Sequence, residues 1–233
     1  MALAPLVSGD DLAALSIPDE HRGSLLKLAS LSDAAVTELH SLLENATPTL
    51  RRWAFARTVG KKATTIAGDE AEGIVLALLE MSLVLETAEV SLDIFLPDVI
   101  AALLEGGPGL IGSEPEQQRM KERLSKLLVL PSVSLPAKGR ALLIEHANYM
   151  CSARVFTDIR PVFGADVKQS PATAVIVHTL KLTYHQGEAN TRNFFIMLDS
   201  HDLDEVSALI ERARAKENSL KALLASTGLE PLE

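Results

Sequence analysis

The spacing of apolar residues along the chain changes once, near Ala153. Before this point apolar residues recur every three or four positions, which predicts amphipathic helices. After it, short segments alternate apolar and polar residues, which predicts strands. The sequence therefore predicts an α+β protein with two domains. These are an all-helical bundle over residues 1–152 and a module of three antiparallel strands and one long helix over residues 153–233.

The helical part is expected to contain segments at about 18–28, 32–43, 47–62, 69–86, 91–104, 115–128 and 137–152. Ser32 has the position and chemistry of a helix N-cap. From Ile74 to Leu85 only Glu80 and Ser82 interrupt the apolar residues. A helix that is apolar nearly all round is buried on all sides, so this segment is predicted to be the centre of the bundle.

The C-terminal pattern predicts strands at Arg154–Phe163, Val175–His185 and Phe194–Leu198. Pro161 cannot donate a hydrogen bond to a neighbouring strand, which favours an edge position for the first strand. Short connections favour an antiparallel meander. A helix with Ser200 as N-cap then carries an apolar stripe and stops near Gly228.

The third strand has no polar face, because Phe195 and Met197 alternate with Phe194, Ile196 and Leu198. Such a strand belongs in a sheet covered on both sides. The single helix that follows can cover one face, so a second surface is expected to cover the other. The two candidates are the N-terminal helices and the same module of a second chain. The residues expected at this interface are Ile176, His178, Leu180, Leu182, Phe194, Phe195, Ile196 and Met197. The pattern leaves open which face of the sheet meets the helix and which meets the partner.

The order of elements from Arg154 to Ala225 resembles that of COMM-domain proteins. The residues that carry the resemblance are Val175–Tyr184, the run Asn193–Asp199, and Asp202 and Leu203 at the start of the last helix. The resemblance implies a non-enzymatic protein. In that family two modules of three strands and a helix clasp each other into a tight dimer that serves as a scaffold in larger assemblies.

The amino-acid composition argues against several classes of function. The net charge is −9, with 22 Lys and Arg against 31 Asp and Glu, which argues against nucleic-acid and anionic-membrane binding. No segment has the roughly 20 apolar residues of a membrane span, and the N-terminus lacks the basic start of a signal peptide. A single cysteine, Cys151, suits a reducing compartment, so a cytoplasmic protein is expected.

Several charged residues are candidates for partner binding. Arg51, Arg52, Arg57, Lys61 and Lys62 lie on one predicted helix and can either bind an anionic partner or supply an ion pair for the buried Glu80. The same helix also supports a separate hypothesis for the function of the protein, in which it is an anion- or nucleic-acid-binding module. Asp158 and Arg160 share a strand face, where they can contact a partner peptide or pair across the sheet.

The remaining polar candidates are isolated. His178 lies on an apolar strand face, and His185 and His201 are expected near each other, without the further ligands that a zinc site needs. Cys151, at a predicted helix end, has only His146 nearby.

No catalytic, metal or cofactor motif is found, so no catalytic residue, metal or cofactor is assigned. The favoured function is a self-associating interaction protein, most simply a homodimer. The alternative is an enzyme or small-ligand protein with a pocket between the helical bundle and the sheet that uses Glu80, Arg57 or His146.

Overall fold

The structure is a computed structural model that describes residues 15–105, 111–144, 148–186 and 190–232. The chain divides into two compact units, a helical unit up to residue 145 and a sheet unit over residues 146–231. Each is described separately. The α+β class and the order of helices, antiparallel sheet and final long helix are as the sequence predicted.

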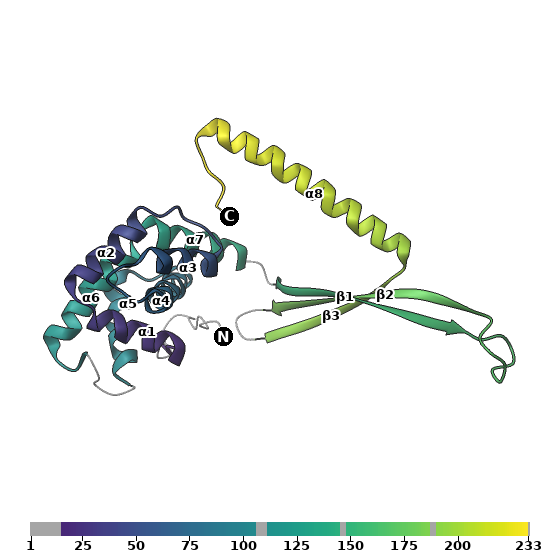
Figure 1. Ribbon diagram of the computed structural model, residues 1–233, viewed down its shortest axis with the longest axis horizontal. Helices are drawn as coiled ribbons and strands as arrows, with labels where there is room; N and C mark the ends of the chain where they lie inside the picture. The colour runs from purple at the N-terminus through teal and green to yellow at the C-terminus, as the bar shows by residue number, and fades with distance from the viewer. Residues whose placement is uncertain (1–14, 106–110, 145–147, 187–189, 233) are drawn as a thin grey trace. The chain divides into compact units, whose positions relative to one another are not determined.

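The helical unit contains seven α-helices among its described residues (Figure 1). They are α1 (Asp19–Ser30), α2 (Asp33–Glu44), α3 (Arg52–Lys62), α4 (Gly68–Ala88), α5 (Leu92–Leu104), α6 (Glu114–Leu128) and α7 (Pro131–Ile144). Helix α4 packs against α1, α3, α6 and α7. Eleven of its residues are buried, among them the fully buried Ile74 and Leu78. The prediction that this helix is the centre of the bundle is confirmed.

Helices α3 and α4 meet at two glycines. A Cβ atom on Gly60 would collide with the backbone carbonyl of Gly68. The absence of side chains at both positions therefore lets the two backbones approach closely. On the side of α3 that faces the core, Phe55 and Val59 are buried, and the opposite side of the helix is exposed.

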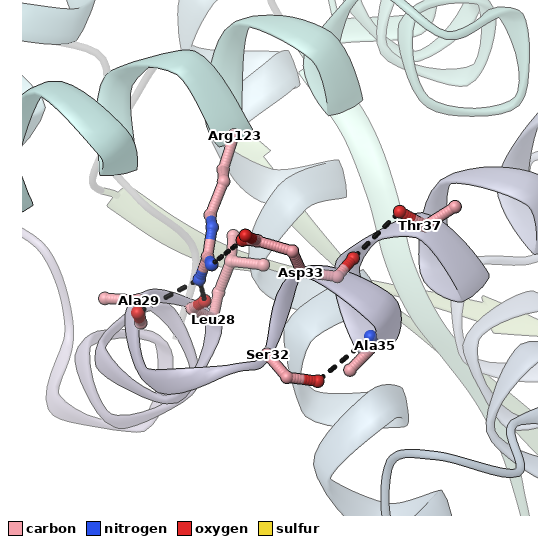
Figure 2. Close-up of polar contacts among 7 residues, drawn as sticks. All are labelled: Leu28, Ala29, Ser32, Asp33, Ala35, Thr37 and Arg123. Atoms are coloured by element: carbon pink, nitrogen blue, oxygen red, sulfur yellow. Dashed lines mark hydrogen bonds and ion pairs between the residues drawn. The ribbon is translucent and has the colours of Figure 1, made fainter.

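Arg123 joins α6 to the junction between α1 and α2 (Figure 2). Its Nη1 donates to the carbonyl oxygens of Leu28 at 2.8 Å and Ala29 at 3.0 Å, and its Nη2 donates to Asp33 Oδ1 at 2.8 Å. The carbonyls of Leu28 and Ala29 belong to the last turn of α1, where the helix has no backbone N–H four residues further on to donate to them. At the same junction Ser32 caps α2 by accepting from the backbone N–H of Ala35, as predicted.

Replacing Arg123 with alanine is expected to lower the free energy of unfolding by about 2–4 kcal/mol, because the carbonyls at the end of α1 lose a charged donor in a buried place. Asp33→Asn is the matched control. The Asp33 side chain is largely exposed, so water screens its charge and its loss is expected to cost about 1 kcal/mol or less. Urea unfolding followed by far-UV circular dichroism measures both. Equal losses in the two variants would contradict this role of Arg123.

The sheet unit has three strands in the order β1-β2-β3, all antiparallel. They are β1 (Asn148–Val162), β2 (Thr173–Gln186) and β3 (Asn190–Leu198), followed by α8 (Ser200–Thr227) (Figure 1). Pro161 lies in β1, which is an edge strand, as the proline predicted. A register shift between Met150 and Ser152 marks a bulge in β1.

Two local predictions are wrong. The last helix of the bundle was expected to reach residue 152, but α7 ends at Ile144 and β1 begins at Asn148. Pairing of Asn148 with Gln186 and of Tyr149 with His185 recruits this segment into the sheet, because non-local strand pairing overrides a local apolar pattern. The N-cap of α8 is Asp199 and not Ser200, since Asp199 accepts from the N–H of Asp202 at 2.9 Å.

The predicted stop of α8 is confirmed, because Gly228 follows it with a φ of 74°. In the described part of the chain no single helix is long and apolar enough to cross a membrane. The pair α6 and α7 meets the length and composition criteria only when taken together, across a bend of 70°.

Candidate interaction surface

The strand register divides the sheet into two unlike faces. Residues directly opposite each other in a ladder point to the same side, so the partners of alternate β2 residues share their face. One set, called here the apolar face, comprises Met150, Ala153, Val155, Thr157, Ile159, Ile176, His178, Leu180, Leu182, Tyr184, Arg192, Phe194, Ile196 and Leu198. Ten of these fourteen side chains are aliphatic or phenylalanine.

The other side, called here the mixed face, alternates apolar and charged groups. It comprises Tyr149, Ser152, Arg154, Phe156, Asp158, Arg160, Val175, Val177, Thr179, Lys181, Thr183, His185, Thr191, Asn193, Phe195 and Met197. Side-chain contacts agree with this division. Thr183 Oγ1 donates to Asn193 Oδ1 at 2.9 Å, and Lys181 Nζ lies 5.7 Å from the centre of the Phe195 ring.

The apolar face is exposed. Ile159 keeps 70% of its surface accessible, Ile176 keeps 54% and Phe194 keeps 51%, while Leu180 and Leu182 at the centre are half-buried. Among the described side chains of the sheet, only Val177 and Leu198 are buried. Large contiguous exposed apolar surfaces are uncommon on monomeric proteins, so this face is a candidate interaction surface.

Helix α8 was expected to cover one face of the sheet, and this expectation is wrong. None of its residues is buried, and Leu209, Ile210, Leu220 and Leu223 are each at least half exposed. The apolar stripe that the sequence predicted is present. Within the sheet unit only its first turns, which carry the half-buried Leu203 and Val206, contact β2 and β3. The sheet unit therefore carries three uncovered apolar surfaces, which are the apolar face, the apolar residues of the mixed face and the α8 stripe.

The eight predicted interface residues divide between the two faces. Six of them lie on the apolar face, and Phe195 and Met197 lie on the mixed face. Sequence reasoning missed the contribution of β1, whose Met150, Val155 and Ile159 complete the apolar face. The alternation of β1 was visible in the sequence, but its alignment with β2 was not.

The three histidines that the structure describes in the sheet unit do not form one site. His178 Nδ1 lies 2.9 Å from Thr157 Oγ1 on the apolar face. His185 stacks on Tyr149 with ring centres 4.9 Å apart. The expectation that His185 and His201 approach each other is wrong, because His185 pairs with Thr191 at the start of β3 and His201 follows the end of that strand.

The basic candidates lie on α3 and have two different environments. Arg52 turns inward and forms an ion pair with the buried Glu80, as one hypothesis from the sequence predicted. Arg140 of α7, which the sequence did not indicate, contacts the same carboxylate at 3.1 Å. Burial lowers the pKa of the Arg52 guanidinium, and the charge of Arg140 lowers it further. Arg51, Arg57, Lys61 and Lys62 are exposed.

The remaining candidates are separate from one another. Cys151 was expected at the end of a helix, but it is exposed and lies in β1. Asp158 and Arg160 share the mixed face and are exposed, and His146 lies outside the described residues. Within the described ranges no group of three or more His, Cys, Asp or Glu side chains is placed to hold a metal ion.

Comparison with known proteins gives no identification. No protein-family model matches the chain, and no curated protein matches it significantly.

Proposed function

We propose that this protein is a non-enzymatic interaction protein that forms a homodimer through the apolar face of its sheet and uses the dimer as a component of a larger assembly. The observation that carries the proposal is the exposure of that face, with Ile159, Ile176 and Phe194 each more than half accessible. The resemblance of residues 154–225 to COMM-domain proteins points the same way.

Energetics favour covering this face. Burying a large aliphatic or aromatic side chain contributes roughly 1.5–3 kcal/mol. Leaving several of them in water forfeits an amount comparable with the net stability of a domain, about 5–15 kcal/mol. A three-stranded sheet needs a packed face for stability, and α8, the one helix of the same unit, has no buried residue. A second copy supplies an identical apolar face and no unpaired charge at its centre.

The dimensions of the face suit a dimer. Strand rise and spacing give it a projected area on the order of 500 Å². Side-chain relief brings the accessible area near the roughly 800 Å² per partner that stable complexes bury. The exposed α8 stripe, about 42 Å long from its 28 residues, provides further apolar surface for the same association.

The single cysteine of the sequence suits a reducing compartment. We therefore include a cytoplasmic location in the proposal.

The oligomeric state of the full chain tests this function. Sedimentation equilibrium across the micromolar range is expected to give twice the chain mass of 25.0 kDa. A single species at 25.0 kDa throughout that range would overturn the homodimer. A pull-down of the native protein identifies the other members of the assembly, and recovery of a related chain in place of a second copy would indicate a heterodimer.

A further inference from the structure

The outward side of α3 is a cationic strip that the proposed dimer does not use. Phe55, Ala56, Val59 and Gly60 are buried against the core. The 3.6-residue period places the other residues of the helix on the opposite, exposed side. Called here the α3 strip, this side consists of Arg51, Trp53, Ala54, Arg57, Thr58, Lys61 and Lys62, all of them exposed.

The geometry of the strip leaves a flat floor between two rows of charge. Ala54 and Thr58 lie along its middle, one helical turn apart, and the Thr58 hydroxyl is satisfied by donating to the Ala54 carbonyl at 2.8 Å. By the helical period Arg57 and Lys61 flank the floor on one side and Lys62 flanks it on the other, while Arg51 precedes the helix as its N-cap residue. Residues four positions apart, such as Arg57 and Lys61, are about 6 Å apart along the axis, close to the spacing of alternate residues in an extended peptide.

The charge of the strip is not balanced locally. No Asp or Glu occurs between Glu44 and Asp69, although the whole chain holds 31 of them. Within the part of the chain that the structure describes, no ion pair involves Arg51, Arg57, Lys61 or Lys62. The half-buried Glu38 of α2 approaches the segment that follows α3, but its carboxylate accepts hydrogen bonds from the hydroxyls and backbone N–H groups of Thr64 and Thr65. These bonds lower the pKa of Glu38 to about 2.

Trp53 is an anchor at one end of the strip. It is the single tryptophan of the sequence and is 58% exposed. The Arg52 guanidinium carbon lies 5.5 Å from the ring centre, and Arg52 is in turn held by the buried Glu80. The indole is thereby supported on one side and open on another. Tryptophan and arginine are the residues most enriched at the energetic centres of protein interfaces.

We infer that the α3 strip binds an acidic peptide segment of a partner protein, with an apolar side chain of that segment against Trp53 and its carboxylates on the two rows of cations. Charge complementarity selects this occupant. A protein with a net charge of −9 repels the extended phosphate backbone of a nucleic acid over most of its surface. A short acidic peptide is small enough to interact only with the positive side chains of the α3 strip.

The test uses the full-length protein and the fluorescence of Trp53, which reports the strip directly because no other tryptophan is present. The probe is the peptide Ac-Glu-Leu-Glu-Glu-Leu-Glu-NH₂. Addition of this peptide at low salt is expected to give a saturable blue shift of the emission. The affinity is expected to fall as salt is added, because exposed charges are screened.

Two charge reversals of equal size make the result specific. Arg57→Glu lies in the strip and is expected to weaken peptide binding by about tenfold or more. Lys126→Glu, on the exposed surface of α6, changes the net charge equally and is expected to leave binding within about twofold. Circular dichroism verifies that both variants fold.

Three results would overturn the inference. The first is the absence of a saturable emission shift when the acidic peptide is added to the unmodified protein. The second is an equal loss of affinity in Arg57→Glu and Lys126→Glu. The third is equally tight binding of a control peptide in which lysine replaces each glutamate of the probe. If a single-stranded oligonucleotide binds more tightly than the acidic peptide and Arg57→Glu abolishes its binding, the strip is a nucleic-acid site and the inference is also wrong. Because the probe contacts α3 alone, the outcome is independent of the oligomeric state.

Discussion

The variant Leu180→Asp is expected to be monomeric at concentrations where the unmodified protein is a dimer. Leu180 lies at the centre of the apolar face, between Val155 of β1 and Ile196 of β3. A carboxylate buried there without a partner costs several kcal/mol at each copy of the site. The dimer dissociation constant is therefore expected to rise at least a hundredfold, as measured by sedimentation equilibrium.

Lys181→Asp provides the matched control for this variant. Residue 181 is adjacent in the same strand but lies on the mixed face, directly opposite Arg154. An aspartate there replaces a like-charge pair with an opposite-charge pair, which is favourable across a ladder. The control is expected to remain dimeric. Loss of association in Lys181→Asp but not in Leu180→Asp would show that the mixed face is the interface.

The second large effect is expected from Glu80→Ala in the helical unit. The Glu80 side chain is 4% exposed and forms ion pairs with Arg52 and Arg140, which are themselves partly buried. Removing one member of a buried charge cluster leaves the other charges poorly compensated, at a cost of about 3–5 kcal/mol. The urea midpoint of the helical unit is expected to fall by about 1 M or more. Trp53 fluorescence follows this transition, because the only tryptophan lies in α3.

Glu70→Gln is the control on the same helix. Glu70 forms a 2.7 Å ion pair with Lys27, but both side chains are more than a third exposed. A pair in that environment contributes about 1 kcal/mol or less. If Glu80→Ala also shifted the midpoint by no more than this, the charge cluster would not stabilise the bundle.

These two experiments address different parts of the chain. Glu80 also holds Arg52, which supports the indole of Trp53. The Glu80 variant is therefore expected to bind the acidic peptide less tightly as well, whereas Leu180→Asp leaves α3 unchanged. Peptide binding measured on both variants separates the α3 strip from the dimer interface.

Much of the helical unit could be predicted from the sequence because its determinants are local. The cap at Ser32 and the apolar run of α4 each depend on residues within a few positions of one another, as does the stop of α8 at Gly228 in the sheet unit. The end of α7 could not be predicted in this way. The residues from Asn148 onward form a strand because β2, more than 25 residues further on, pairs with them.

Part of the candidate surface could be predicted, because the alternation of residues along one strand is also a local pattern. The alternation in β2 and β3 predicted two faces and most of the apolar residues on them. The side chains that complete the apolar face come from β1, and only the register brings Val155 opposite Leu180. Likewise, the sequence pointed to α3 as the partner of Glu80, but Arg140 lies 60 residues away and no local pattern indicates it.

The sequence by itself determined the type and order of the elements and the amount of apolar surface that each carries, since these follow from side-chain chemistry at periods of 3.6 and 2. Apart from α4, whose burial its apolar residues on all sides predicted, the tertiary structure decided which of that surface is buried. It placed the apolar residues of α4 inside the bundle and left those of the sheet and α8 exposed. Burial depends on contacts between residues far apart in the chain, and a pattern along one segment does not contain them.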